Sequence, residues 1–252
     1  PYLAHIALYF KHIKFFMDKS LKTFLKYAGK DYYNRSVNPP VVRASTILFR
    51  TMEELRKHQK DIRKNKDVEH WDYGRQGTQT TVQLQRLLRK LEGAHQVFLT
   101  PTGFSAVALS IMSLCRPGDE IVISDGVYRP TQKLTDELLK EFNIKAIWYN
   151  PNNFNDLKNK ITTKTKLIYV ENPGSNTFEM QDLGKVILLA KKKKIYTAID
   201  NTWATAYFFK PLKLGFDISI TSATKYYSGH SDVMGGTVAV NKKVYKKVWW
   251  YN

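Results

Sequence analysis

The sequence predicts an α/β fold in which a mostly parallel sheet is sandwiched between helices. Short apolar runs rich in β-branched residues alternate with helical stretches over most of residues 97–240. This alternation is typical of a parallel sheet that is covered on both faces. Polar or glycine-containing turns follow several of the predicted strands, and ligands of such sheets bind beyond the carboxyl ends of the strands. The 252 residues, 43% of them hydrophobic, suffice for a substantial core.

The predicted elements are bounded by turn signals such as the Arg-Pro-Gly-Asp run at residues 116–119. The predicted strands are 97–99, 120–124, 146–149, 166–170, 196–200, 216–221 and 237–240. The predicted helices are 81–91, 104–114, 131–142, 155–161 and 183–193. No internal repeat or low-complexity linker divides this alternating region.

The N-terminal third predicts an arm rather than a part of the sheet. Residues 43–49 follow Pro39-Pro40 and are expected to be extended. Thr51, with Glu54 three residues later, is a predicted N-cap for a helix that runs towards residue 65. Residues 2–16 are apolar and aromatic, but three basic residues interrupt them, so a membrane span or signal peptide is not expected. We therefore expect an upstream extension over 1–16, an arm with a helix over 17–70 and a large domain over 71–252.

Charge and cysteine content exclude several classes of function. The formal net charge of +18 is compatible with nucleic-acid binding, but the lysines are scattered. The densest run, at residues 191–194, ends a predicted helix, where cations are favoured. We therefore predict no nucleic-acid partner and no membrane partner. The single Cys115 excludes an intramolecular disulfide, and no Cys/His cluster predicts a metal, which fits a cytoplasmic protein.

Lys225 is the leading candidate for a catalytic residue. It follows a predicted strand, within the run Ser-Ala-Thr-Lys-Tyr-Tyr-Ser-Gly-His-Ser-Asp at residues 222–232. Small neighbours let a planar ligand approach, the hydroxyls of Ser222 and Thr224 can donate to a phosphate, and a lysine amine can form a Schiff base with an aldehyde. The ordinary interpretation is a solvated surface lysine, since the chain has 40 Lys and Arg residues.

Other predicted strand ends carry polar groups that could serve the same ligand. A turn at residues 100–106 opens a helix at Gly103 and Phe104, whose N–H groups could bind a phosphate. Asp200 ends a strand and could pair with a pyridinium nitrogen, or could simply cap the next turn. Tyr128 lies in a strand-end loop and could stack on a ring, although most of the 15 tyrosines must pack in the core. Glu171 begins a further polar turn, at residues 171–175.

Taken in order, these motifs resemble the Cys/Met-metabolism family of fold-type I enzymes that use pyridoxal phosphate (PLP). The motifs are Tyr-Gly-Arg-Gln-Gly-Thr from residue 73, Thr-Gly-Phe-Ser-Ala from 102, Tyr at 128, Glu-Asn-Pro-Gly-Ser from 171, Asp-Asn-Thr-Trp-Ala from 200 and the lysine run. The resemblance covers essentially all of residues 17–252, and within the family it is closer to bacterial beta-lyases than to the gamma-synthase or gamma-lyase branches.

The resemblance implies a role for each site residue. Lys225 would form the Schiff base and take the Cα proton, Asp200 would face the pyridinium nitrogen, and Tyr128 would stack on the ring. Gly103, Phe104, Ser222 and Thr224 would hold the phosphate. Tyr73 and Arg75 would reach the phosphate in a neighbouring subunit, which implies a homo-oligomer, a dimer of dimers, with shared active sites. Ser175 stands where relatives often carry Asn and receives no role.

The implied activity is that of a carbon–sulfur lyase. It would eliminate a thiol from the amino acid cystathionine, giving homocysteine, pyruvate and ammonia, in the transsulfuration step of methionine biosynthesis. Relatives continue into a smaller C-terminal domain with a substrate-binding arginine, which this chain is expected to lack. The alternatives are an inactive PLP-binding fragment, a related gamma-synthase or cysteine desulfhydrase, and a basic nucleic-acid-binding module.

Overall fold

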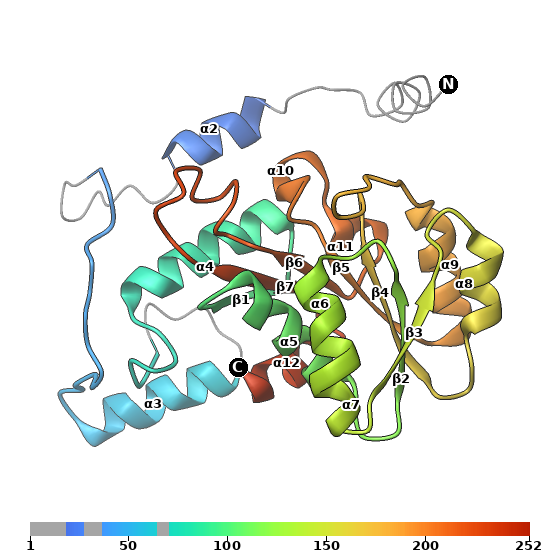
Figure 1. Ribbon diagram of the computed structural model, residues 1–252. Coiled ribbons are helices and arrows are strands. Elements are labelled where there is room, and N and C mark those ends of the chain that lie inside the picture. Colours follow the sequence, from blue (N-terminus) through green and yellow to red (C-terminus); the bar gives the residue numbers. More distant parts are fainter. Residues whose placement is uncertain (1–18, 28–36, 65–70) are drawn as a thin grey trace. The chain divides into compact units, whose positions relative to one another are not determined.

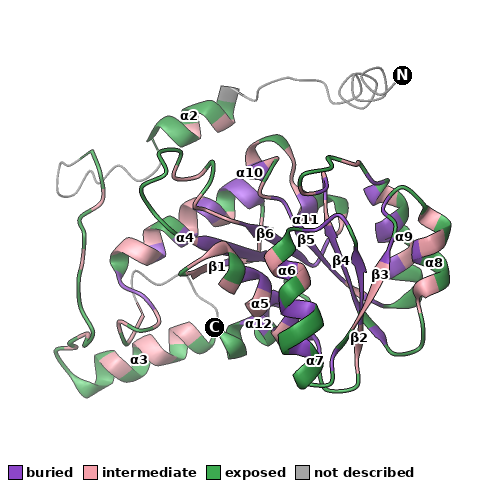
Figure 2. Ribbon diagram, viewed as in Figure 1, coloured by how far each residue is buried: buried purple, intermediate pink, exposed green. Residues whose placement is uncertain are grey.

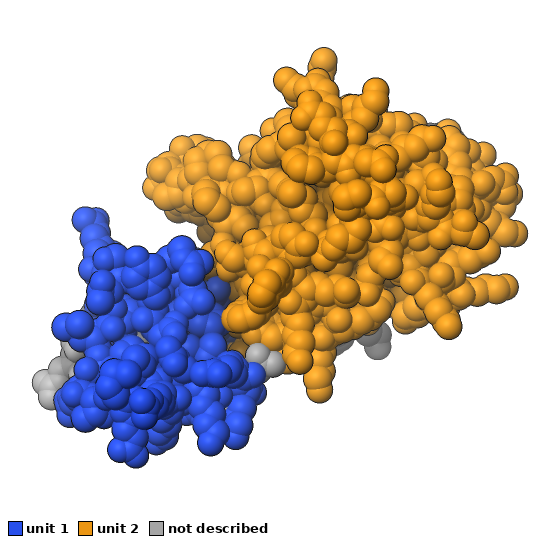
Figure 3. All heavy atoms as spheres, turned by 90° about the horizontal axis from the view of Figure 1, so that it is seen from below, with its two compact units in different colours: residues 1–87 blue, residues 88–252 orange. Residues whose placement is uncertain are grey.

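The computed structural model describes residues 19–27, 37–64 and 71–252, and its chain divides into two compact units, residues 1–87 and 88–252 (Figure 3). The predicted extension over residues 1–16 lies outside the described residues. The predicted boundary at residue 71 falls inside the first unit and stays a prediction. In the described ranges, no helix is both long and apolar enough to cross a membrane.

The first unit holds α2 (Lys19–Tyr27), α3 (Met52–Arg63) and most of α4 (Gln79–Glu92) (Figure 1). The predicted N-cap of α3 is confirmed, because the Thr51 hydroxyl accepts a hydrogen bond from the Glu54 N–H at 3.1 Å. Tyr73 forms an isolated antiparallel bridge with Thr46. Next to that bridge, a Cβ on Gly74 would lie 1.9 Å from the Ala44 carbonyl oxygen, so only glycine fits there.

The second unit contains one seven-stranded sheet in the order β1-β7-β6-β5-β4-β2-β3. Its strands are β1 (Gln96–Thr100), β2 (Glu120–Ser124), β3 (Lys145–Tyr149), β4 (Thr165–Glu171), β5 (Tyr196–Asp200), β6 (Ile218–Thr221) and β7 (Gly236–Val240). β7 pairs antiparallel with both β1 and β6, and the other pairings are parallel. The predicted mostly parallel α/β sheet is therefore confirmed.

Helices cover both faces of this sheet (Figure 1). They are α5 (Gly103–Leu114), α6 (Arg129–Lys133), η1 (Leu134–Leu138), α7 (Leu139–Glu141), α8 (Phe154–Lys160), α9 (Leu183–Lys193), α10 (Thr205–Phe208), α11 (Pro211–Leu214) and α12 (Tyr245–Tyr251). The helix predicted over 131–142 is interrupted by the π-helical turn η1, where the Leu139 N–H donates to the Leu134 carbonyl. The short helices α10, α11 and α12 were not predicted.

Alternate residues of β2, β4 and β5 pack into two separate apolar clusters. In β4, Leu167 and Tyr169 face the cluster that contains α5, whereas Ile168 and Val170 face the cluster that contains α9. All four are fully buried, and Figure 2 shows the central strands as the most buried layer. A core of this kind fixes the strands on both faces and leaves their ends as the natural place for a ligand.

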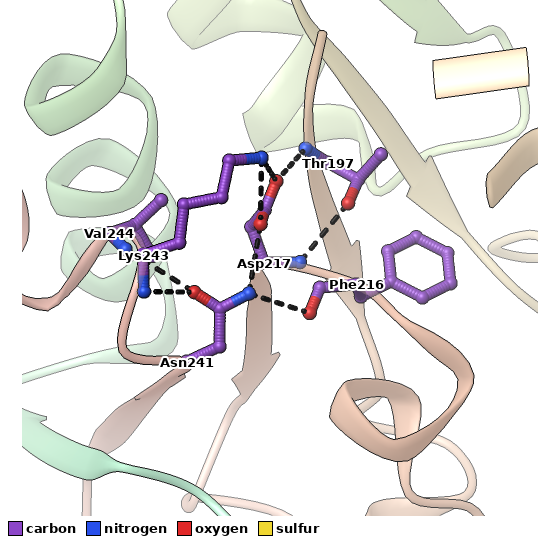
Figure 4. A network of polar contacts seen from close by, with 6 residues as sticks. All are labelled: Thr197, Phe216, Asp217, Asn241, Lys243 and Val244. Atoms are coloured by element: carbon purple, nitrogen blue, oxygen red, sulfur yellow. Dashed lines mark hydrogen bonds and ion pairs between the residues drawn. The ribbon is translucent and has the colours of Figure 1, made fainter. Parts of the chain in front are cut away.

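The amino-terminal edge of β5 and β6 is closed by a polar network around Asp217 (Figure 4). Its carboxylate accepts hydrogen bonds from the Thr197 N–H at 3.1 Å and the Asn241 side chain at 2.8 Å. The Lys243 ammonium pairs with it at 3.0 Å. The Asp217 N–H donates in turn to the Thr197 hydroxyl at 3.1 Å. Both carboxylate oxygens are satisfied, so this edge serves structure.

Candidate active site

The predicted site residues of the second unit follow the carboxyl ends of parallel strands. β1, β2, β4, β5 and β6 run in the same direction, so their carboxyl ends meet at one edge of the sheet. The turn to Gly103 follows β1, the loop to Tyr128 follows β2, Asp200 is the last residue of β5, and the Lys225 segment follows β6. The topology therefore collects these groups on one edge, as the alternating pattern predicted.

Hydrogen bonds hold the backbone around Lys225 in a tight turn after β6. The Lys225 N–H donates to the Ser222 carbonyl at 3.1 Å, and the Gly229 N–H donates to the Lys225 carbonyl at 2.8 Å. The side chain is exposed. Within the part of the chain that the structure describes, its amine has no hydrogen bond or ion pair. A fixed backbone with a free amine suits a nucleophilic lysine.

Gly103 and Ser222 form one side of a candidate phosphate site. A Cβ on Gly103 would lie 2.6 Å from the Ser222 hydroxyl oxygen, so the turn after β1 packs directly on the turn after β6. Thr102 caps α5 and binds the Ser105 N–H at 2.9 Å. The first intrahelical bond of α5 runs from the Ala106 N–H to the Thr102 carbonyl, so the N–H groups of Gly103 and Phe104, earlier in the first turn, have no intrahelical partner. Two free donors beside a hydroxyl can bind an anion.

Thr224 lies next to this group, but its hydroxyl is engaged. It donates to the Gly235 carbonyl at 3.2 Å and accepts from the Gly235 N–H at 3.1 Å. These bonds tie the lysine turn to the residue before β7. The predicted contact of Thr224 with a phosphate requires that the hydroxyl change partner, and it stays a prediction.

Asp200 is almost fully buried at the end of β5, with 9% of its surface exposed. One carboxyl oxygen accepts from the Thr202 N–H at 2.9 Å, so the ordinary capping interpretation holds for that oxygen. The Thr202 hydroxyl accepts from the Ser222 N–H at 2.8 Å, which joins this turn to the lysine segment. Burial raises the pKa of Asp200, and the Thr202 hydrogen bonds lower it. Among the described residues it has no ion pair, so it can still receive a cation.

Glu171 also lies at this edge of the sheet, although its sequence motif alone predicts no role for it. It ends β4 and lies opposite Asp200 in the parallel ladder. Its carboxyl accepts a hydrogen bond from the Tyr128 N–H at 2.7 Å, and the Tyr128 side chain is half exposed. Burial, and then the charge of Asp200, raise the pKa of Glu171 to about 8. The sequence shows only an acid that follows a predicted strand, and its place opposite Asp200 depends on the pairing of β4 with β5.

Three aromatic side chains also connect the strand-end loops. Trp203 contacts Phe178 with ring centroids 5.3 Å apart and Tyr226 with centroids 6.3 Å apart, both edge to face. All three are exposed. They add apolar surface beside Lys225 and Asp200 that a substrate could contact.

Tyr73 and Arg75 lie in the first unit, and both are exposed. Their contact with a phosphate in a neighbouring subunit stays a prediction. In the described residues, no group of three or more His, Cys, Asp or Glu side chains could hold a metal ion. A free lysine amine, a buried carboxyl without a cation and a cup of N–H donors together fit a planar aldehyde that carries a ring nitrogen and a phosphate.

Comparison with known proteins agrees with this fit. The family "Cys/Met metabolism PLP-dependent enzyme" matches residues 23–251. The chain is 35% identical to cystathionine beta-lyase of Escherichia coli over 92% of the chain and 58% of that protein. It is 31% identical to the L-alanine/L-glutamate racemase of Wolbachia pipientis, over 90% and 58%.

A solved structure has the same fold. The cystathionine gamma synthase of Xanthomonas oryzae pv. oryzae, in complex with aminoacrylate and cysteine, matches with a TM-score of 0.81 and 29% identity, over 91% of this chain and 57% of that one. The chain thus spans less than two thirds of the length of these relatives.

Proposed function

The chain belongs to the Cys/Met metabolism family of PLP-dependent enzymes, and on that premise we propose that it is a carbon–sulfur lyase acting on cystathionine. The proposed products are homocysteine, pyruvate and ammonia, in sulfur amino-acid metabolism. The convergence of Lys225, Asp200 and Gly103 on one edge of the sheet carries the proposal. The similarity to the E. coli beta-lyase supports the choice of reaction.

Each residue of the edge has a role in this proposal. PLP, when bound, stabilises negative charge at the Cα of an amino acid. Lys225 would hold the cofactor and would take the Cα proton, because its amine has no partner among the described residues. Asp200 would offer a negative charge to the ring nitrogen, and Tyr128 would stack on the ring. The N–H groups of Gly103 and Phe104, with the hydroxyls of Ser222 and Thr224, bind the phosphate.

The assembly and location are part of the proposal. Tyr73 and Arg75 complete the phosphate site of a neighbouring subunit in a dimer of dimers, since a guanidinium matches phosphate oxygens. The buried, unpaired Cys115 supports a reducing cytoplasm. The partner of the site is a small amino acid, with no nucleic acid and no membrane.

Two other activities have specific support. The racemase relative and the gamma-synthase structure both match most of this chain. All three reactions need a residue that removes a proton from Cα, which is the role given to Lys225. They differ in the step that follows, so the product decides between them.

The test is product analysis, with added PLP, of the 252-residue chain joined to the C-terminal domain that relatives carry. The joined protein should release pyruvate from cystathionine, and its Lys225→Ala variant should release none above background. Formation of cystathionine from cysteine and an activated homoserine, or racemisation of alanine, without pyruvate release would contradict the lyase proposal in favour of a relative's reaction. Cofactor binding without turnover would favour an inactive PLP-binding fragment.

A further inference from the structure

Glu171 connects the two groups that are proposed to hold the cofactor ring. Its carboxyl fixes the backbone of Tyr128 through the 2.7 Å hydrogen bond. Its strand position lies directly opposite Asp200, and adjacent positions of a parallel pair present their side chains on the same face. A change in the protonation of Glu171 therefore affects both Tyr128, which is proposed to stack on the ring, and Asp200, which is proposed to face the ring nitrogen.

The surroundings of Glu171 are acidic. The titratable groups that influence it are Asp200 on β5 and Glu179 in the segment after β4, and Glu171 in turn raises the pKa of the buried Tyr169 phenol on β4. Glu179 packs against Gly126 and Gly174, and one of its oxygens is buried without a hydrogen-bond partner in the described residues. Asp125 lies near Glu179, and burial and then Glu179 raise its pKa.

Among the described residues, no cation forms an ion pair with Glu171 or Asp200. A buried carboxyl group and a partly buried one beside it cannot both ionise at low cost. The direction of the Glu171 pKa agrees with this argument. In the absence of ligand, the pair is therefore expected to retain one proton at neutral pH, on Glu171.

We propose that Glu171 exchanges this proton for the positive charge of the cofactor: it is protonated in the cofactor-free protein and releases its proton to solvent when the positively charged ring nitrogen of PLP binds at Asp200. The inference rests on the proposed PLP site. The charge balances, because the pair goes from −1 to −2 while the ring contributes +1. The proton leaves the Glu171 carboxyl for water or buffer, and no bond of the cofactor changes in this exchange.

The proposal predicts a proton count that can be measured. Calorimetric titration of the 252-residue chain with PLP, in buffers of different ionisation enthalpy, gives the number of protons exchanged on binding. At about pH 7, native protein should release up to about one proton more than Glu171→Gln. Between about pH 6 and 8, native affinity should rise relative to that variant by up to about tenfold per pH unit.

Glutamine is the matched substitution at this position. Its amide oxygen can still accept the Tyr128 N–H, so the loop position is kept while the exchangeable proton is removed. Glu120→Gln, at the opposite end of β2, is the control and should keep the native proton count. Glu179→Gln should also keep most of the release, because Glu179 is a neighbour and not the proposed carrier.

A second measurement needs no variant. The infrared difference spectrum of 13C-labelled native protein should lose a protonated-carboxyl band when PLP is added, and the isotope shift separates this band from the cofactor aldehyde. Equal proton counts for native protein and Glu171→Gln, an unchanged infrared band, or loss of the release in Glu179→Gln would each overturn the proposal. These outcomes leave the proposed function intact, whereas failure of native protein to bind PLP overturns both.

Discussion

Two buried aspartates at opposite edges of the sheet differ in how their carboxyl groups are satisfied. Asp217 binds the Thr197 N–H, the Asn241 amide and the Lys243 ammonium, which occupy both of its oxygens. Asp200 binds Thr202, and within the described residues it has no cation. Both are less than a tenth exposed. Burial alone therefore does not identify a functional carboxylate. A buried carboxylate that can still bind a cation is the better candidate.

The largest expected effect concerns Lys225, which follows β6 at the Asp200 edge and whose amine has no partner among the described residues. Lys225→Ala should abolish the cofactor adduct that borohydride reduction traps, because no Schiff base can form without the amine. Mass spectrometry of reduced protein measures the adduct. Lys243→Ala, at the Asp217 edge, is the control and should retain it. An adduct of native stoichiometry in Lys225→Ala would show that another lysine carries the cofactor.

Removing the satisfied carboxylate should damage the fold and not the cofactor site. Asp217→Ala leaves the buried Thr197 N–H without its acceptor, and it deprives Asn241 of a partner. We expect a loss of about 2–4 kcal/mol in the free energy of unfolding, below the cost of breaking a fully buried pair because Lys243 is half exposed. Urea denaturation measures it. A loss below about 0.5 kcal/mol would contradict the structural role.

A third buried carboxyl group, on Glu92, extends the comparison to the pH dependence of stability. Burial raises its pKa from 4.5 to about 7, although the Tyr227 hydroxyl donates to it at 3.0 Å. The folded state thus binds the proton more tightly than the unfolded state. The contribution of Glu92 to the free energy of unfolding is therefore fully present below about pH 4.5. About 3 kcal/mol of it is lost as the pH rises towards 7.

Glu92→Gln should remove this pH dependence, because glutamine is neutral throughout and still accepts from Tyr227. Urea denaturation at several pH values between about 5 and 8 compares it with native protein. Glu141→Gln, on the exposed surface of α7, should keep the native dependence. Parallel curves for native protein and Glu92→Gln would exclude Glu92 as the source.

The smallest expected effect is at the phosphate cup. Gly103→Ala places a methyl group against Ser222, which must move by several tenths of an ångström. Overpacking of this kind costs about 1–3 kcal/mol, and we expect PLP affinity to fall about tenfold. Fluorescence titration measures it. Gly184→Ala, at the start of α9, is the control, and equal affinities of the two variants would argue against a phosphate at Gly103.

Much of the fold could be predicted because its elements are regular. Each predicted strand is present. The strand predicted over 216–221 begins two residues later, at Ile218, because Asp217 takes part in the polar network with Thr197. The break at η1 escaped prediction, since the apolar positions of residues 131–142 suit a continuous helix. The four-residue helices α10 and α11 are too short to produce a helical period.

The residues of the candidate site were predicted from sequence motifs. Contacts between residues of different motifs were not predicted. Lys225, Asp200, Gly103 and Ser222 stand in recognisable runs, and the structure places them on one edge. The role of Glu171 depends on register between β4 and β5, which a linear sequence does not display. The engaged hydroxyl of Thr224 depends likewise on Gly235, a contact made only in the folded chain.

The dissociation constant of PLP for Asp200→Asn tests the central claim most directly. Asparagine keeps the hydrogen bond from Thr202 and removes only the charge offered to the ring nitrogen. We predict binding at least about tenfold weaker than in native protein, with a free energy of unfolding within about 1 kcal/mol of native. Native affinity in Asp200→Asn, or a loss of stability like that of Asp217→Ala, would contradict the distinction between the two edges.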